Sequence, residues 1–525
     1  MSTEANIQAG QPDPELRLEI SYVDDPQVTK DQVAEEYTNH VVPASARLDK
    51  KSVLASWSSI ASAMAFVYYG ALAATLVGVT QALIGVAVTC IIYAAIAGFG
   101  GAKAIRTGLN STLMSREIFG VKGAAICPLI IAIGCAFYAV FESSVLAAAL
   151  QTFFGFGDIK LWYLVVTACM VPLMLGGMQT WMGKLNGLSL PIYFFGLVAA
   201  VIVAGIRFGW NGEWDLFDAA PSTTSIPGWL TVVVLYMGVW LVFPEIQDCA
   251  RMAKSEDTRF HVNVSFGIVF WSVAYFFNAV VGMVIVALAF GQPGVAPTEL
   301  GAVQGVIASL GVVGLIVIIV SQVRINTANY YFISISAERF VAHFTTKNLT
   351  RRNWVLLSTV VVMIVMFTDI FSYLTTALAW MGVLVSAWVG MQLVNWTINR
   401  GKAIEFRPNR IKSVAPGFYL WLAATVIGIV LVEMPDQFPT LSALAPLVTF
   451  AIAVVGYTIM LLAKATALRP IVTDPIRDEV ADLWDVRVRC ASCNLSYIAV
   501  EMDTTRDGQA ALCLNCQTLK TVTTQ

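Results

Sequence analysis

The apolar stretch LGVVGLIVIIVSQVRINTANYYFISISA, residues 310–337, has the length and composition of a membrane-spanning helix. About 20 consecutive apolar residues are enough to cross the hydrocarbon core of a bilayer. Arg324 lies near the middle of this stretch. A charged side chain there costs about 2.5–3.5 kcal/mol on insertion scales, so it usually faces a cavity or a polar partner. The stretch predicts a membrane protein with a functional position inside the membrane.

The whole chain has the composition of a multi-pass membrane protein. It is 525 residues long, 57% hydrophobic and 13% charged, with a mean hydropathy of +0.72, whereas soluble domains carry about 25% charged residues. The net charge of −2 gives no sign of a nucleic-acid partner. The sequence has neither a GxxxxGK[ST] phosphate loop nor an HExxH motif. We therefore expect neither an ATP-driven pump nor an enzyme.

Twelve apolar segments of spanning length define a membrane domain at residues 51–467. A polar N-terminal tail, 1–50, is expected to be loosely ordered, and a polar C-terminal tail occupies 468–525. The predicted spans are 53–78, 80–102, 125–150, 161–181, 186–206, 229–247, 264–290, 302–333, 354–372, 375–398, 415–433 and 442–466. The predicted fold class is an all-α polytopic membrane protein.

Lysine and arginine are distributed unevenly over the predicted loops. The loops after even-numbered spans carry 17 of these residues, and those after odd-numbered spans carry two, Lys160 and Arg207. Cytoplasmic loops carry the excess of positive charge. We therefore expect a multi-pass protein of the cell (cytoplasmic) membrane with both termini in the cytoplasm.

The C-terminal tail contains two CxxC pairs, formed by Cys490, Cys493, Cys513 and Cys516. Two turns that each present two thiolates have the spacing of a four-thiolate Zn²⁺ site, with iron as an alternative metal. Two disulfides are the other interpretation, which the expected cytosolic location disfavours. The tail is predicted to be a small zinc-ribbon-like module.

Three motifs resemble the nucleobase:cation symporter-1 family, in particular its cytosine permeases. They are ASARLDK (44–50) followed by GGAKAIRTGLNSTLMSREIFGVKGA (100–124), DCARMAKS (248–255) and NTAN (326–329). The sequence departs from the family in span ten, where VLVSAWVGMQLVNWTINR (383–400) lacks the family's Pro-Pro and Ala-Asp-Tyr signature. Such permeases do not generally carry a four-cysteine tail.

The resemblance implies a LeuT-like fold of two inverted five-helix repeats, spans 1–5 and 6–10, plus two helices. The substrate is then expected near the membrane midplane, against broken stretches of spans one and six. Gly70 in span one, and Gly238 and Pro244 in span six, are candidate helix breakers. Alternatively, these residues reflect only the higher frequency of Gly and Pro in membrane helices.

Tyr138 and Glu142 lie four residues apart in span three and therefore share one helix face. The resemblance places Tyr138 at a substrate-stacking position and Glu142 at a position where a related transporter has Gln. A carboxylate accepts hydrogen bonds and carries charge, whereas an amide both donates and accepts. We expect Glu142 to bind N–H groups of a ring edge or to carry the coupling proton. The alternative is a structural role, in which Glu142 pairs with a basic neighbour or is protonated in a tightly packed bundle.

Other residues are weaker candidates for the substrate site. Asn326 and Asn329 are expected to contact a polar ring edge, although each equally suits a bond to a neighbouring helix. Trp240 and Phe243 are expected to provide flat apolar walls, with helix packing as the alternative. The substrate-binding set is therefore Gly70, Tyr138, Glu142, Trp240, Phe243, Asn326 and Asn329. Glu245, Asp248 and Arg251 are expected to form a gate or a helix-end cluster.

Arg324 has a specific interpretation under this resemblance. Sodium-coupled members of the family complete a sodium site with two span-eight hydroxyls, and those positions correspond to Arg324 and Ile325 here. Neither side chain offers the oxygen ligands that a hard cation needs. We expect the guanidinium to occupy the space of the sodium ion and to bond carbonyls of span one. The alternative is a structural salt bridge between Arg324 and Glu142.

The predicted function is a secondary active transporter, a permease or symporter, that imports a nucleobase such as cytosine or a purine, or a related planar nitrogen heterocycle, by alternating access. Transport is expected to be proton-coupled or sodium-independent. Two alternatives stay open. One is a transporter-derived membrane sensor that signals through the zinc tail to a cytosolic protein. The other is a permease for a cationic or guanidine-bearing solute. The expected partners are a small molecule and the lipid bilayer.

Overall fold

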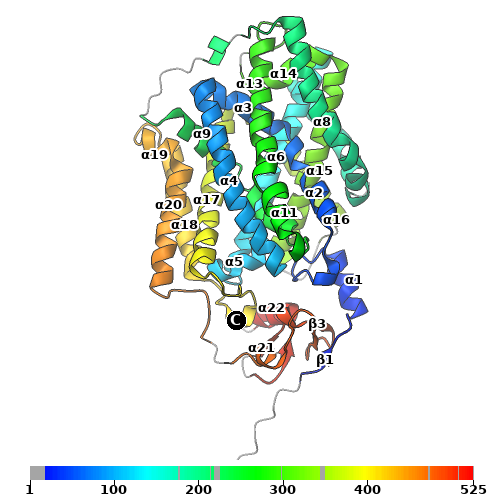
Figure 1. The fold of residues 1–525 in the computed structure, drawn as a ribbon, viewed down its shortest axis with the longest axis vertical. Coiled ribbons are helices and arrows are strands. Elements are labelled where there is room, and N and C mark those ends of the chain that lie inside the picture. The colour runs from blue at the N-terminus through cyan, green and yellow to red at the C-terminus, as the bar shows by residue number, and fades with distance from the viewer. Residues whose placement is uncertain are drawn as a thin grey trace, which may run out of the picture.

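The computed structural model consists of a long helical bundle with a small mixed module at one end (Figure 1). It describes residues 18–175, 178–212, 214–217, 225–296, 298–342, 349, 351–470, 473–505 and 508–523. The first part of the predicted N-terminal tail, residues 1–17, lies outside the described residues.

Eight helical segments of the described chain are long and apolar enough to cross a membrane, and two bent pairs raise that number to ten. The eight are α4 (Val79–Thr107), α6 (Ile126–Phe154), α8 (Met178–Phe208), α13 (Asn278–Ala289) with the helical turns before it, α15 (Val312–Ala342), α17 (Leu374–Ile398), α18 (Pro416–Glu433) and α20 (Ala445–Leu462). The shorter helices α7 (Ile159–Leu175) and α16 (Arg351–Met366) lie at predicted spans four and nine. The chain is therefore a multi-pass membrane protein.

The predicted bounds of span eight are wrong. The apolar run from 302 to 333 is divided into α14 (Gly301–Leu310) and α15 by Gly311, whose φ of +61° is left-handed. Glycine adopts this conformation without the steric cost that other residues meet. A hydropathy profile does not detect such a break, because the residues on both sides of it are equally apolar. Arg324 remains well inside the 31-residue helix α15.

Span one is broken between α2 (Lys50–Trp57) and α3 (Met64–Val77), which meet at an angle of 43°. The break contains the run SSIASA, and the hydroxyls of Ser58, Ser59 and Ser62 donate to carbonyls three residues earlier at 2.8–3.0 Å. Such local bonds compete with the helical ladder. The expectation that Gly70 breaks this span is wrong, because Gly70 lies inside α3 and the serine cluster precedes it.

Span six is broken between α9 (Gly228–Met237) and α10 (Val242–Ala250), which meet at 51°. The predicted break at Gly238 is confirmed. A Cβ atom on Gly238 would lie 2.6 Å from the carbonyl oxygen of Leu378, so glycine also permits the close approach of α17. Pro244 lies in the first turn of α10, where its missing N–H leaves no helical bond unmade.

Glycines bring α3 against α13 at backbone distance. A Cβ on Gly70 would lie 2.2 Å from the Cα of Ala279, and one on Gly282 would lie 2.0 Å from the carbonyl oxygen of Val67. Small residues let membrane helices approach this closely. Gly70 therefore contributes to packing against the neighbouring helix.

Gly70→Ala is expected to destabilise the protein, because the new methyl group meets backbone atoms that cannot rotate away. Overpacking of this kind costs about 1–3 kcal/mol. The measurement is the melting temperature of the purified full-length chain, with Gly123→Ala as the matched control. At Gly123 the nearest contact of an added Cβ is 3.4 Å. A melting temperature for Gly70→Ala equal to that of Gly123→Ala would contradict the packing role.

The C-terminal tail folds as a compact module. Its three-stranded antiparallel sheet has the order β1 (Ile20–Ser21), β2 (Arg487–Arg489) and β3 (Ser496–Ile498), and β4 (Asp503–Thr504) pairs with β5 (Ala511–Leu512). The helices α21 (Pro475–Glu479) and α22 (Leu514–Thr523) complete it. Ile476, Val488 and Met502 belong to its own buried apolar core.

The N-terminal segment is part of this module. Residues 20–34, expected in a loosely ordered tail, instead form β1, which pairs with β2, and α1 (Pro26–Ala34), whose Val28 joins the module core. The strand partner lies in the distant C-terminal segment, so no local pattern indicates the pairing. Both described ends of the chain therefore lie at the same end of the bundle (Figure 1).

A buried arginine joins the module to the helical bundle. Arg407, in the loop between α17 and α18, bonds the carboxylates of Glu405 and Asp474 at 2.7 Å and the carbonyl of Met502 at 3.2 Å. Its side chain is 1% exposed. Arg410, in the same loop, bonds Asp503 at 2.9 Å. These ion pairs fix the module against the loop.

Candidate functional site

A small cavity lies where the broken stretches of spans one and six face α6 and α15. Its volume is about 40 Å³. About 10–15 Å³ is enough for one water molecule, whereas small-molecule pockets usually measure about 300–1,000 Å³. The structure therefore shows this central region contracted, and a ring-sized ligand requires it to widen.

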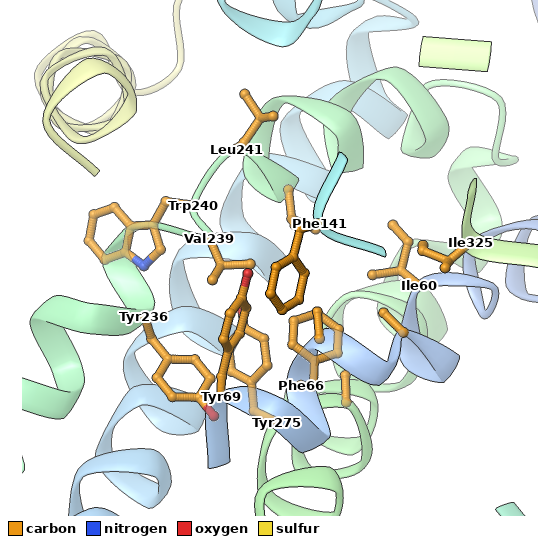
Figure 2. Close-up of a cluster of buried hydrophobic side chains, with 14 of the residues drawn as sticks. Ile60, Phe66, Tyr69, Phe141, Tyr236, Val239, Trp240, Leu241, Tyr275 and Ile325 are labelled. Atoms are coloured by element: carbon orange, nitrogen blue, oxygen red, sulfur yellow. The ribbon is translucent and has the colours of Figure 1, made fainter. Parts of the chain in front are cut away.

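Aromatic side chains form much of the cavity wall: Phe66, Tyr69, Tyr138 and Phe332. Tyr69 packs its ring on Phe141 with centroids 5.5 Å apart, within the aromatic cluster of Figure 2. The buried hydroxyl of Tyr69 has no hydrogen-bond partner among the described residues. The Tyr138 hydroxyl donates to the carbonyl of Gly238 at 3.2 Å, which attaches α6 to the span-six break. Flat apolar walls with few polar groups suit a planar ligand.

Glu142 is buried at the cavity wall, 2% exposed. Gln322 of α15 donates its side-chain amide to the Glu142 carboxylate at 2.6 Å and to the Glu142 carbonyl at 2.9 Å. The carboxylate also lies close to the backbone amide of Ala65, in the first turn of α3. Free amides at the start of a helix favour a negative group. Two donors leave acceptor capacity on the carboxylate, which has about four lone-pair sites.

Glu245 is a second acidic side chain at the same cavity, which the sequence interpretation missed. It is 5% exposed, and the Cys135 thiol donates to it at 3.2 Å. From sequence, Glu245 is placed with Asp248 and Arg251 in a gate or a helix-end cluster at the end of span six. The break at Gly238–Leu241 instead puts Glu245 in the first turn of α10, beside the cavity. Its position directly after a predicted break was the available signal.

Arg324 reaches the break in span one. Its guanidinium donates to the hydroxyls of Ser62 at 3.4 Å and Ser58 at 3.3 Å. The neighbouring Ser321 hydroxyl donates to the Ser62 carbonyl. No ion pair joins Arg324 to Glu142, both of which the structure describes. The alternative of a salt bridge between spans three and eight is therefore wrong.

The other predicted site residues differ in position. Asn329 lines the cavity and donates to Asn326 at 3.4 Å, and Asn326 donates to Ser143 at 3.2 Å. Trp240 and Phe243 are buried and do not line the cavity in this conformation. Trp240 packs against Tyr93, and Phe243 packs against Trp396. Figure 2 shows Trp240 apart from the rings of Phe66 and Phe141.

A polar cluster closes the bundle on the side of the module. Asp248 pairs with Arg339 at 2.7 Å and accepts bonds from the amide and hydroxyl of Ser111 at 2.9 and 2.8 Å. These contacts join α10, α15 and α5 (Ser111–Phe119). The sequence-based expectation of a gate or a helix-end cluster stays a prediction.

The N-terminal segment packs against this cluster. Arg251 donates to the carbonyls of Tyr37 at 2.7 Å and Glu36 at 2.9 Å. Both residues have left-handed φ values, +53° and +51°, which are costly for side chains of this size. The buried His40 then bonds Glu501 of the module at 3.1 Å. The segment thus links the closed end of the bundle to the four-cysteine module.

The His40–Glu501 contact is expected to make this docking pH-dependent. Burial lowers the pKa of His40, but the charges of Glu501 and Glu35 outweigh burial and the repulsion of Arg116, so the pKa is raised. The stabilisation is complete below the ordinary histidine pKa of about 6.5 and is lost as pH rises through the raised value. As pH rises through the raised pKa, hydrogen–deuterium exchange of residues 36–43 should become faster. The rates are first corrected for the intrinsic pH dependence of amide exchange.

His40→Gln is the control for this measurement, because it retains a hydrogen-bond donor that does not titrate. Its corrected exchange is expected to be independent of pH. Equal pH profiles for the wild type and His40→Gln would contradict the role of the pair.

The four tail cysteines converge on one point. One ligand atom of each lies within 4.8 Å of the others, and the Sγ atoms of Cys493 and Cys513 are 3.9 Å apart. A tetrahedral site with Zn–S bonds of about 2.3 Å has S···S edges of about 3.8 Å. The backbone amide of Cys513 donates to Cys490 Sγ at 3.3 Å, which stabilises a thiolate. All four are free cysteines, so the disulfide alternative is wrong. The residues fit a metal ion.

No family model matches this chain, and no curated protein sequence matches it. Among solved structures, the inward-facing conformation of Mhp1 aligns with a TM-score of 0.63 at 18% identity. The alignment covers 82% of this chain and 97% of Mhp1. Mhp1 in a closed conformation with bromovinylhydantoin bound, described as a nucleobase-cation-symport-1 family transporter, aligns with a TM-score of 0.59 at 17% identity over the same shares.

A Na⁺-coupled sialic acid symporter in a substrate-bound outward-open state also aligns. Its TM-score is 0.54 at 12% identity, and the alignment covers 80% of this chain and 90% of the symporter. These similarities confirm the predicted LeuT-like fold with an additional C-terminal module. The structural resemblance to a nucleobase-cation-symport-1 transporter is also confirmed, and the structural neighbours are transporters rather than enzymes.

Proposed function

We propose that this chain is a secondary transporter of the nucleobase:cation symporter-1 type, which imports a nucleobase or related planar nitrogen heterocycle across the cell membrane by alternating access. The observation that carries the proposal is the cavity at the two helix breaks, with Tyr138, Glu142 and Asn329 on its wall. In the open conformation Tyr138 stacks on the ring, Glu142 accepts its N–H groups, and Asn329 bonds its polar edge.

The second part of the proposal concerns the coupling ion. Arg324 acts as a built-in cation at the junction of spans one and eight, so transport is independent of sodium and is driven by protons or by the substrate gradient. This is supported by the bonds of the guanidinium to Ser58 and Ser62, which lie near the two ends of the span-one break. These two bonds are made to hydroxyls, whereas the sequence predicts bonds to span-one carbonyls. A fixed guanidinium does not dissociate, unlike a bound ion.

The third part concerns the tail. The Cys490, Cys493, Cys513 and Cys516 cluster holds Zn²⁺, and both termini lie in the cytoplasm, where thiols stay reduced. Bound zinc ties together the turns that carry the four thiolates. The module in turn holds the N-terminal segment against the closed end of the bundle. A cytosolic protein that docks on the module is the corresponding partner if the chain acts as a sensor.

Uptake into proteoliposomes tests the proposal. Labelled cytosine, adenine, guanine, uracil and hydantoin are each supplied to vesicles that contain the purified full-length chain. We expect at least one labelled compound to accumulate above the level in protein-free vesicles. An excess of the same compound without label should abolish this accumulation. Ligand-dependent binding of a cytosolic protein to the module, without flux of any compound, would overturn transport in favour of a sensor.

A further inference from the structure

The central cavity is acidic, which a neutral heterocycle does not require. Two carboxylates, Glu142 and Glu245, lie on its wall. No lysine, arginine or histidine is among the described residues that line it. Both glutamates are at least nine-tenths buried. Buried carboxylates are costly unless a proton or a cation compensates for them.

The Glu142 carboxylate of α6 and the Glu245 carboxylate of α10 lie at different heights along the axis of α6. Cys135, Tyr138 and Glu142 share one face of this helix, and the Cys135 thiol marks the level of Glu245 through its 3.2 Å bond. Seven residues separate Cys135 from Glu142, which corresponds to about 10 Å along the helix axis. Tyr138 lies between them. A flat ring stacked on Tyr138 therefore has one carboxylate toward each end.

Another polar group on the cavity wall, the hydroxyl of Tyr69, also has bonding capacity to spare. The Tyr69 hydroxyl is buried at the cavity wall and has no partner among the described residues. A buried hydroxyl without a hydrogen-bond partner is unfavourable. This observation is independent of the acidic pair, and a polar ligand in the widened cavity would satisfy the Tyr69 hydroxyl.

We infer that the substrate of this site is a planar organic cation with N–H donors at both ends of the ring, such as an amino-substituted heterocycle that carries an amidine-type group. Glu142 accepts from one end and Glu245 from the other. The aromatic faces of Tyr138 and Phe66 contribute cation–π attraction. This inference rests on the proposed function, because it names the substrate class of the same cavity.

Arg324 does not oppose this assignment. Its neighbour Ile325 lines the cavity, while the guanidinium bonds the serine hydroxyls of the span-one break. The positive charge of Arg324 is thus directed at span one. The ligand supplies the compensating charge for the two glutamates.

Equilibrium binding to the purified full-length chain in nanodiscs tests the inference with three probes of similar shape. These are 4-aminobenzamidine, which is cationic with donors at both ends; benzamidine, which is cationic with donors at one end; and 4-aminobenzamide, which is neutral. The expected order of affinity is the order given. A charged hydrogen bond contributes enough for a step of about 10- to 100-fold between 4-aminobenzamidine and 4-aminobenzamide.

Two isosteric variants assign the effect to the glutamates. Glu142→Gln and Glu245→Gln are each expected to weaken 4-aminobenzamidine by about tenfold or more and to change 4-aminobenzamide little. Glu256→Gln, at an exposed glutamate outside the cavity, is the matched control. Retained binding of 4-aminobenzamide shows that a variant is folded. If a variant loses all binding, its thermal melting curve replaces that check.

Equal affinity for the charged and neutral probes, or unchanged affinity in both glutamine variants, would overturn the inference. Flux of uracil together with no binding of the cationic probes leaves transport in place and overturns only the cationic substrate. Cation binding that depends on both glutamates, without flux of any probe, supports the inference and overturns the transport function.

Discussion

Replacing Cys490 and Cys513 with serine together is expected to abolish metal binding and to unfold the C-terminal module. The two residues belong to different CxxC turns, and both are fully buried in the module core. Apparent binding free energies of structural zinc are about 10–16 kcal/mol, which exceeds what so small a core supplies. Metal content of the purified protein should fall from one zinc ion per chain to none.

Unfolding of the module should also release the N-terminal segment from the helical bundle. The His40–Glu501 pair and the β1–β2 pairing both depend on the folded tail. Limited proteolysis is therefore expected to cut the N-terminal segment in the double variant and to leave the helical domain intact. Cys169→Ser, which changes a thiol outside the cluster, is the control and should retain full zinc content. Full metal content in the double variant would contradict the four-thiolate site.

Arg324→Ala is expected to reduce transport by about 10- to 100-fold. The variant removes the buried donor that spans the break in span one and leaves the Ser58 and Ser62 hydroxyls without it. A hydrogen bond from a charged donor contributes about 1.5–3 kcal/mol, and about 1.4 kcal/mol corresponds to a factor of ten. The initial rate of uptake measures the effect, with the melting temperature as a check on folding.

Two companion variants separate the charge of Arg324 from its shape. Arg324→Lys retains the charge but loses the planar fork of donors, and is expected to keep intermediate activity. Arg324→Ser combined with Ile325→Ser restores two hydroxyls and is expected to make transport respond to sodium, because a hard cation needs oxygen ligands. Wild-type rates in Arg324→Ala would show that the guanidinium has no part in transport.

Much of the membrane architecture could be predicted from hydropathy, because a spanning helix must be apolar along its whole length. The four-thiolate site could also be predicted from sequence, since the spacing of the two CxxC pairs alone defines the arrangement. The break at Gly238 also followed from a local feature. These predictions share one property: the signal lies within about 30 residues of sequence.

The missed features depend on contacts between distant residues. Gly311 divides an apolar run into two helices, although the composition of the run is the same on both sides. Glu245 becomes a cavity residue only once α10 is bent away from α9. The pairing of β1 with β2 joins the two ends of the chain. In each case the residues were visible in the sequence, but their environment was set by tertiary packing.

The most direct test of the central claim is the ion dependence of uptake by the wild-type chain. The compound that gives the largest flux is supplied in the external medium of proteoliposomes, under an inward sodium gradient or, separately, an inward proton gradient. With Arg324 as the built-in cation, uptake should be indifferent to sodium and should either follow the proton gradient or proceed without an ion gradient. A strict requirement for sodium would contradict this and would return Arg324 to a structural role at the span-one break.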